Sequence, residues 1–273
     1  MNNILLEVKK ISNEISINIF QQISVENNIN FTDRHLDSFS AIEDVEIEES
    51  IVIFGLNPSS SDIDTHGVPS PCFLHYVPEG DFEKANNALL IKDEIIRRKY
   101  TYDTYFKKPY NLFYDLNQNF MPIWKNIHYL NKIKLELNIQ DNDSIVDFLF
   151  SICSNSKRFI IFSDLVQYRE KSAKKIEAIL SNSKIDLKIE VIRLFELQLK
   201  LYKAKYVFIN NAYASHLIHN YLKTKMNLSD DLIYSCLEYN GIKFIFSSLV
   251  TGVRALDLFN FARLRNEIKT IIN

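Results

Sequence analysis

The residues best suited to chemistry follow apolar stretches of the chain. Asn57 comes two residues after Ile51–Gly55, a stretch typical of a buried strand in a parallel sheet. The Asn-Pro-Ser-Ser-Ser-Asp run that begins at Asn57 cannot continue a strand, because its side chains bond locally and proline fixes its own φ. The chain must therefore leave the sheet at the carboxyl end of the strand, which is where open α/β sheets bind their ligands.

Three further apolar stretches, at 158–163, 204–209 and 242–246, also end in small polar loops, which open with Asp164, Asn210 and Ser247. Helices are expected to follow them at 171–179, 217–222 and 253–272, with an amphipathic leading helix at 3–22 that packs against the sheet and an additional edge strand at 189–194. Strands that alternate with helices predict a three-layer α/β/α fold with a central, mainly parallel four-stranded sheet.

The whole chain, 1–273, is expected to form a single domain. Its parts would be an N-terminal helical lead-in (1–50), a helical and aromatic insertion after the first strand (63–155) and the remaining core (156–273). With 273 residues, 47% of them hydrophobic, the chain can bury a large core. Only five glycines and six prolines are present, so flexible linkers are not expected.

Composition excludes some classes of protein and leaves others open. The net charge of -2 neither requires nor excludes a nucleic-acid partner, because a local basic cleft can form in a neutral protein. Cys72, Cys153 and Cys236 show no Cys-x-x-Cys pairing, which argues against a metal cluster and for a reducing compartment. His66 and His75 have no third ligand nearby, so we expect no metal and no cofactor. Since no run of 18 apolar residues occurs either, a cytoplasmic protein is expected.

Two basic features of the insertion leave alternatives open. The expected helix at 81–100 ends in Arg97–Lys99, which could meet phosphate or simply complement the helix dipole. The stretch 100–114 interleaves aromatic side chains with lysines, which suits a surface that stacks bases and contacts backbone phosphates. An insertion packed by its own aromatic side chains would have the same composition.

Taken in order, the four strand ends resemble the motifs of the uracil-DNA glycosylase superfamily. The first motif is Gly55–Ser59, and it is closest to the branch with asparagine, as in the mismatch-specific thymine/uracil enzymes. The second is similar to 162–169, where other branches carry asparagine at the place of Asp164, and the third to 207–212. The last motif of the family, His/Asn-Pro-Ser-x-Leu-Ser with an arginine shortly after, is matched only loosely by 246–251 and Arg254.

This resemblance implies a hydrolase of base excision repair that flips a damaged, deaminated or modified base out of DNA and cleaves its N-glycosidic bond. It implies DNA as the partner and no metal. The catalytic residues it implies are Asn57, which would orient the attacking water, and Ser248, which with neighbouring hydroxyls would stabilise charge on the departing base. The implied substrate-binding residues are Gly55, Pro58, Ser59, Phe73, Asp164, Asn210, Ser247 and Thr251, and the implied DNA-binding residues are Arg169, Leu249 and Arg254.

Several of these roles have specific consequences. Phe73 would stack on the flipped base, and Leu249 with Val250 would wedge into the duplex while Arg254 grips phosphate. Asp164 would accept hydrogen bonds where asparagine both donates and accepts, so it would suit a base that offers an amino group over uracil's O4. The hypothesis that follows is that the substrate is not plain uracil.

Each role has a structural alternative. Asn57 could form an Asx turn, Asp164 could cap the following helix, Phe73 could pack its own loop, and Leu249 with Val250 could cover the core. The competing function is a catalytically weak or inactive member of the fold that binds nucleic acid or a nucleotide, because the last motif lacks its histidine or asparagine and its proline. An unrelated enzyme such as a nucleotide transferase is less consistent, since the sequence has no phosphate-binding glycine loop.

Overall fold

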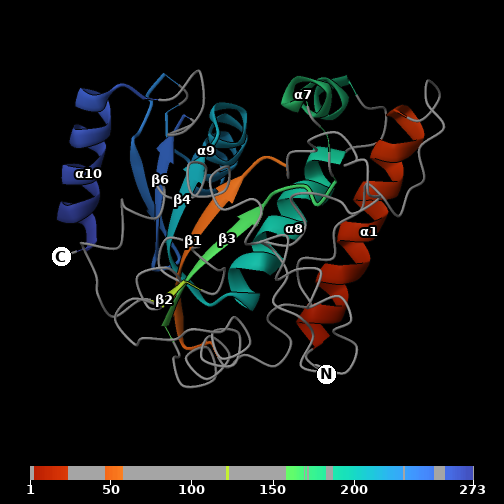
Figure 1. Ribbon diagram of the computed structural model, residues 1–273, viewed down its shortest axis with the longest axis horizontal. Helices are drawn as coiled ribbons and strands as arrows, with labels where there is room; N and C mark the ends of the chain where they lie inside the picture. The colour runs from red at the N-terminus through yellow and green to blue at the C-terminus, as the bar shows by residue number, and fades with distance from the viewer. Residues whose placement is uncertain are drawn as a thin grey trace, which may run out of the picture.

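The computed structural model describes residues 3–23, 47–57, 121–122, 158–168, 170, 172–182, 187–229, 231–248 and 256–272. These residues form an α/β fold on one six-stranded sheet with the order β2-β3-β1-β4-β6-β5 (Figure 1). The strands are β1 Glu49–Gly55, β2 Met121–Pro122, β3 Arg158–Asp164, β4 Ala204–Asn210, β5 Cys236–Tyr239 and β6 Ile242–Ser247. All neighbours pair in parallel except β5 and β6, which are antiparallel.

The four predicted core strands are confirmed as β1, β3, β4 and β6, but the sheet is wider than the four strands predicted. The short strand β2 lies at one edge and β5 at the other. β5 and β6 form a hairpin whose turn residues, Asn240 and Gly241, have φ values of 52° and 74°. Asn-Gly is the preferred sequence for such a two-residue turn, so a signal for β5 was present in the sequence. The predicted insertion at 63–155 lies outside the described residues apart from β2.

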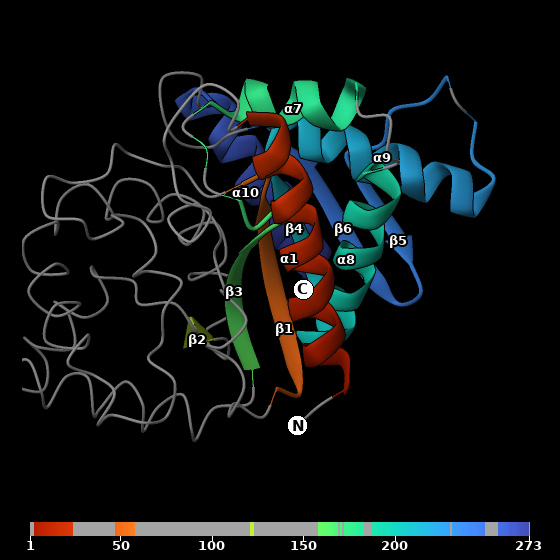
Figure 2. The ribbon, with the colours of Figure 1, turned by 90° about the vertical axis from the view of Figure 1, so that its right-hand side faces the viewer.

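Helices cover both faces of the sheet. They are α1 Asn3–Ile23, α7 Ala173–Asn182, α8 Leu187–Leu201, α9 Ala212–Met226 and α10 Leu258–Ile272. On one face, Phe244 of β6 contacts Phe195 of α8, and Phe246 contacts His219 of α9. On the other face, Tyr206 of β4 donates a hydrogen bond to the carbonyl of Ile272 at the end of α10. The described part of the chain therefore has the three-layer α/β/α arrangement (Figures 1 and 2).

The leading helix is confirmed as α1, but its neighbour differs from the one expected. α1 packs on α8, which itself covers the sheet, so α1 forms an outer layer beyond α8 (Figure 2). The predicted edge strand at 189–194 is wrong, because these residues belong to α8. Its buried residues are Leu187, Val191, Leu194, Phe195, Gln198 and Leu199, and this spacing of three and four has the period of a helix.

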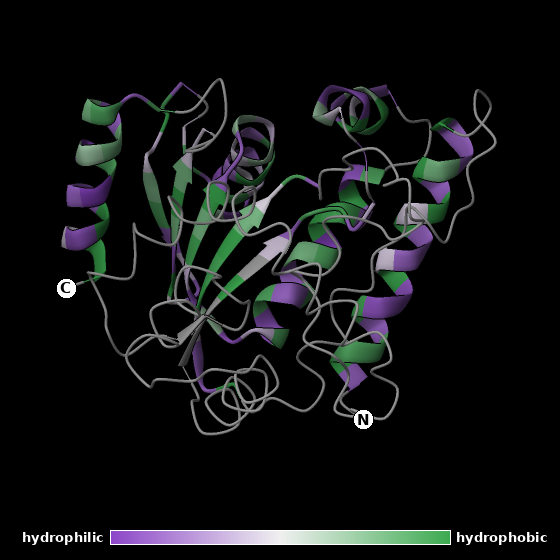
Figure 3. Ribbon diagram, in the orientation of Figure 1, coloured by the Kyte–Doolittle hydropathy of each residue, from purple (hydrophilic) through white to green (hydrophobic). Residues whose placement is uncertain are grey.

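The core is formed by the two central strands and the helices against them. Residues 51–54 of β1 and 206–209 of β4 are all buried, and Figure 3 shows these strands as the continuous hydrophobic centre of the sheet. The aliphatic residues that α1 buries are Leu5, Val8, Ile11, Ile15 and Ile19. Among the described helices, none combines the length and the apolar character needed to cross a membrane.

Candidate functional site

The order of the strands creates a switch point at β1. β3 pairs with β1 on one side, and after α7 and α8 the chain returns as β4 on the other side of β1. Connections on the two sides of such a point diverge, which leaves room above the carboxyl ends of the strands, where open α/β sheets bind ligands. The predicted polar residues follow these same strand ends.

Four of the predicted residues form one row across the carboxyl ends of four parallel strands. Gly55 pairs with Asp164, and Asn210 pairs with Ser247. Phe54 pairs with Ile209, so one residue further on Gly55 lies beside Asn210. Residues in register on neighbouring strands face the same side of a sheet. The row in the order of the sheet is therefore Asp164, Gly55, Asn210 and Ser247.

The direction of the Ser163 side chain shows on which face of the sheet this row lies. Ser163 donates a hydrogen bond to Gln198 of α8, so its side chain faces α8. Because side chains alternate along a strand, Asp164 faces the opposite side. Tyr206 faces α10, and Asn210 is four residues further along the same strand, so it lies on that side too. The row thus belongs to the face of the sheet that α10 covers.

Asp164 lies directly over Gly55. A Cβ atom built on Gly55 would overlap Asp164 Oδ1, so only glycine leaves space for this carboxyl group. The Asp164 side chain is buried, with 7% of its surface exposed. Burial penalises the charged form and raises the pKa of Asp164 to about 7. At neutral pH this group therefore exists both as a neutral acid and as a carboxylate.

The amide of Asn57 joins two of the loops at this edge. Asn57 Nδ2 donates to the carbonyl of Glu170 at 3.0 Å and to that of Tyr168 at 3.4 Å. Two backbone hydrogen bonds also hold the loop after β1 to the loop after β3. Leu165 N–H donates to the carbonyl of Gly55, and Val166 N–H donates to the carbonyl of Leu56. The orientation of the Asn57 amide is thus fixed, with Nδ2 toward the β3 loop and Oδ1 on the opposite branch of the amide.

The ends of β4 and β6 are held by the start of α9. Asn211 caps α9 by accepting a hydrogen bond from Ala214 N–H at 2.9 Å. Ser215 Oγ lies 2.7 Å from the carbonyl oxygen and 3.2 Å from the amide nitrogen of Ser247. The backbone N–H of Ser247 is therefore bound within the protein, which leaves its hydroxyl, and not its N–H, as a candidate for stabilising a leaving base. Ser248 follows it and is half-buried.

A buried polar cluster behind Asp164 was not predicted. Gln167 Nε2 donates to the Asp164 carbonyl at 2.9 Å, and Gln198 Nε2 does so at 3.3 Å. Ser163 Oγ donates to Gln198 Oε1 at 2.8 Å and lies 3.1 Å from the hydroxyl of Tyr202. The only signal for this cluster in the sequence was a glutamine at a buried position of a helical pattern.

One remaining prediction is wrong, and the others concern residues outside the described ranges. Asp164 is not the N-cap of the following helix, because α7 begins nine positions later, at Ala173. The other implied residues lie outside the described ranges, as do the two histidines weighed as metal ligands: Pro58, Ser59, Phe73, Arg169, Leu249, Thr251, Arg254, His66 and His75. Within those ranges, no group of three or more side chains could hold a metal ion.

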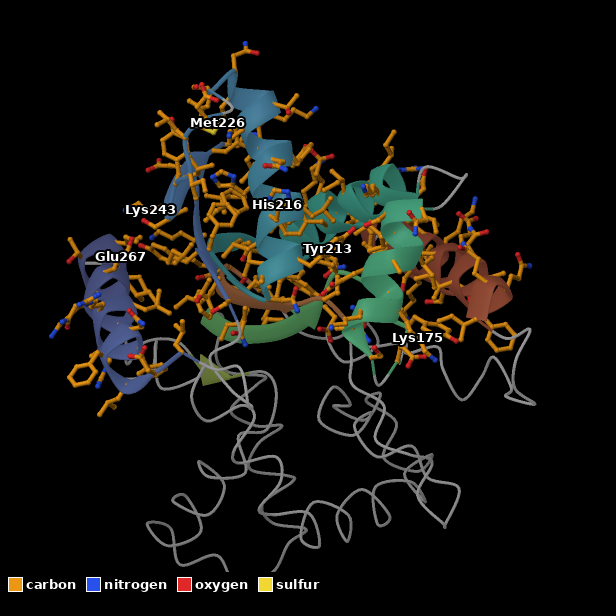
Figure 4. The ribbon with its side chains drawn as sticks, turned by 90° about the horizontal axis from the view of Figure 1, so that it is seen from above. Lys175, Tyr213, His216, Met226, Lys243 and Glu267 are labelled. Carbon is orange, nitrogen blue, oxygen red and sulfur yellow. The ribbon has the colours of Figure 1, made fainter. Side chains whose placement is uncertain are left out.

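Figure 4 looks onto the carboxyl ends of the parallel strands. α7 and α9 flank this edge, and Tyr213 of α9 lies 3.4 Å, between hydroxyl oxygens, from Ser181 of α7. The predicted basic helix after β3 is confirmed as α7, on which Lys174 and Lys175 are exposed, with Lys175 labelled in Figure 4.

No protein-family model matches the chain, and no curated protein matches it significantly.

Proposed function

We propose that the protein is a DNA glycosylase of the uracil-DNA glycosylase type, which cleaves the N-glycosidic bond of a flipped damaged, deaminated or modified base. The observation that carries the proposal is the row at the carboxyl edge, in which the Asp164 carboxyl lies over Gly55 beside Asn210. A planar, polar ligand such as a nucleobase is recognised by hydrogen-bonding groups of this kind along its edge.

In this proposal Asn57 orients the water that attacks the sugar. Its Nδ2 is held by two carbonyl groups, so its Oδ1 has a defined direction before any substrate binds. A preorganised acceptor lowers the entropic cost of bringing water to the developing oxocarbenium centre. Because an amide is not a strong base, water is oriented here more than it is deprotonated. The hydroxyls of Ser247 and Ser248 stabilise the negative charge on the departing base.

The protonation of Asp164 determines which base edges it can bind. As a carboxylate it only accepts hydrogen bonds, which favours a base that offers an amino group, as the sequence predicts. As a neutral acid it both donates and accepts, so it also matches a base edge with a carbonyl oxygen. Since the pKa of Asp164 is raised to about 7, selection against plain uracil is expected to be strong at pH 8 and weaker at pH 6.

The test uses DNA duplexes and single strands that each carry one deaminated, oxidised or alkylated base. Base release is measured as strand nicking after alkali, at pH 6 and at pH 8. Asn57→Ala is expected to slow release about 100-fold, the size of effect that a misplaced reacting group produces. The matched control is Asn266→Ala, because Asn266 is exposed on α10. If the wild type releases no base, or if Asn57→Ala releases it at the wild-type rate, the proposed glycosylase mechanism is wrong.

A second variant tests the geometry of the row independently of Asn57. Gly55→Ala places a methyl group where Asp164 Oδ1 lies, so the carboxyl group must move. Base release is expected to fall in Gly55→Ala while circular dichroism still reports a folded α/β protein. Uracil as the preferred base at pH 8 would contradict the proposed role of Asp164 and leave the glycosylase activity standing.

A second candidate is a nucleotide- or nucleic-acid-binding protein without catalysis. The observation that favours it is the pair of Asn57 hydrogen bonds, since they also suit a residue whose only task is to hold two loops together. Binding of labelled oligonucleotides measured by fluorescence anisotropy, without base release, would support this candidate.

A further inference from the structure

The backbone carbonyl of Asp164 is held by two side-chain amides from different parts of the chain. Gln167 follows three residues later, in the loop after β3, and its Nε2 lies 2.9 Å from the carbonyl oxygen. Gln198 lies on α8, 34 residues away, and its Nε2 lies 3.3 Å from the same oxygen. The position of Asp164 therefore depends on a helix that covers the opposite face of the sheet from its carboxyl group.

The other end of the Gln198 amide binds the preceding residue. Gln198 Oε1 accepts a hydrogen bond from Ser163 Oγ at 2.8 Å, and this hydroxyl also lies 3.1 Å from Tyr202 OH. One amide thus contacts two consecutive residues of β3, Ser163 through its side chain and Asp164 through its backbone. Such a pair of contacts restricts both the twist of the strand end and the direction of the next side chain.

All four polar side chains of this cluster are buried. The exposed fractions are 4% for Ser163, 2% for Gln167, 0% for Gln198 and 1% for Tyr202. Hydrogen bonds in such surroundings are strongly directional, and a buried polar group left without a partner is costly. Apolar side chains could fill the same space, but they would not fix the direction of the backbone. The hydrogen bonds therefore hold the end of β3 in a single arrangement.

We infer that Gln198 is a positioning residue of the candidate site, because through Ser163 and the Asp164 carbonyl it holds the Asp164 carboxyl over Gly55. Ser163 is held toward α8, so the alternation of the strand points Asp164 to the other face, where Gly55 leaves the space for it. The inference rests on the proposed function for the reaction that Asp164 serves. The position of the carboxyl group itself can be tested without that reaction.

The experiment compares Gln198→Met with Lys200→Met in the full chain. Methionine has a volume similar to that of glutamine but no hydrogen-bonding groups, and Lys200 is exposed near the end of the same helix, which makes it the matched control. The carboxyl resonances of aspartate-labelled protein are followed by carbon-13 NMR as a function of pH. The resonance of Asp164 is assigned by its absence from Asp164→Asn. Base release from the preferred duplex is measured over the same pH range.

In Gln198→Met the carboxyl group can turn toward water, so its pKa is expected to fall by about one unit toward the ordinary value of an aspartate. The pH profile of base release is expected to move in the same direction, whereas Lys200→Met should match the wild type in both measurements. A folded Gln198→Met protein with an unchanged Asp164 titration would overturn the inference. Should Gln198→Met not fold, Ser163→Ala removes the hydroxyl group that donates to Gln198 Oε1 and is judged by the same criterion.

Failure of the inference and failure of the proposed function give different results. If the wild type releases no base while the Asp164 titration still shifts in Gln198→Met, the positioning role stands and the glycosylase proposal falls. If base release is present but neither the titration nor the pH profile changes, Gln198 has no positioning role and the glycosylase proposal stands.

Discussion

At the scale of single residues, the site is shaped by the cost of burying Asp164. The raised pKa means that the folded protein binds a proton that the unfolded chain releases between the ordinary aspartate value and about 7. Over this interval the folded state holds more protons, so the stability contribution of Asp164 is lost as pH rises. Wild-type protein is therefore expected to pay a penalty above pH 7 that a neutral side chain would avoid.

Asp164→Asn is expected to raise the free energy of unfolding at pH 8 by about 2–4 kcal/mol, the order of magnitude that a shift of this size implies. The gain should shrink to nearly zero below about pH 3, where the acid is protonated in both the folded and the unfolded state. Urea denaturation at a series of pH values measures it. Asp231→Asn is the control, because Asp231 is exposed. A gain that does not depend on pH would show that burial of the charge is not its cause.

The site residues that could be predicted from the sequence are those at the ends of strands. Asn57, Asp164 and Asn210 could be identified because a polar residue at or just after the end of a buried strand has few places to lie other than the edge of the sheet. The contact between Asp164 and Gly55 could not be predicted, since it depends on the register of two strands more than 100 residues apart. Gln198 was missed for a similar reason, because a helical pattern does not report which buried amide finds a partner.

At the scale of elements, α9 holds the segment that leads into β5. His219 Nε2 accepts a hydrogen bond from Tyr234 N–H at 3.0 Å, and Lys223 Nζ donates to Leu232 O at 3.0 Å. The His219 ring also packs edge-on against Phe246 of β6. A protonated imidazole cannot accept the Tyr234 hydrogen bond, so this connection between α9 and the segment before β5 requires neutral His219.

Burial lowers the pKa of His219, with a smaller contribution in the same direction from Lys223 and His216. As pH falls below the ordinary histidine value of about 6.5, the unfolded chain takes up a proton before the folded protein does, so the stability contribution of His219 is lost. His219→Phe is expected to lower stability by about 1–2 kcal/mol at pH 7.5, because Tyr234 N–H loses its acceptor. The difference from the wild type should narrow at pH 5.

Thermal unfolding at the two pH values measures this difference. His216→Phe is the matched control, since His216 is exposed on the same helix. A difference between wild type and His219→Phe that widens as pH falls would contradict the role given to the neutral ring.

The element scale also shows why one prediction failed. The residues 189–194, Ile-Glu-Val-Ile-Arg-Leu, are rich in β-branched side chains and resemble a strand when taken alone. In the longer window their buried neighbours recur at helical spacing, and the contact of Phe195 with both Phe54 and Phe244 fixes α8 against the sheet. Tertiary packing decided the outcome over local preference.

At the scale of the whole molecule, α1 lies outside α8 and packs mainly against that helix. It buries Leu5, Val8, Ile11, Ile15 and Ile19, and its Glu7 forms an ion pair with Arg193 of α8 at 2.8 Å. The ion pair is exposed and contributes little, whereas the aliphatic side chains contribute about 1.5–3 kcal/mol each. Their sum is comparable with the net stability of a domain, so α1 is expected to fold and unfold together with the core.

Two substitutions on α1 test this cooperation. Ile15 is 1% exposed and Leu6 is 48% exposed, so they differ in burial on the same helix. Ile15→Ala is expected to lower the free energy of unfolding by about 2–5 kcal/mol, because a cavity forms in the hydrophobic core, while Leu6→Ala should lower it by less than about 0.5 kcal/mol. Because α1 belongs to the cooperative unit, urea denaturation of Ile15→Ala should show a single transition with a lower midpoint and an unchanged slope. A separate early transition, with the main midpoint unmoved, would mean that α1 detaches on its own and that α8 can hold Asp164 without it.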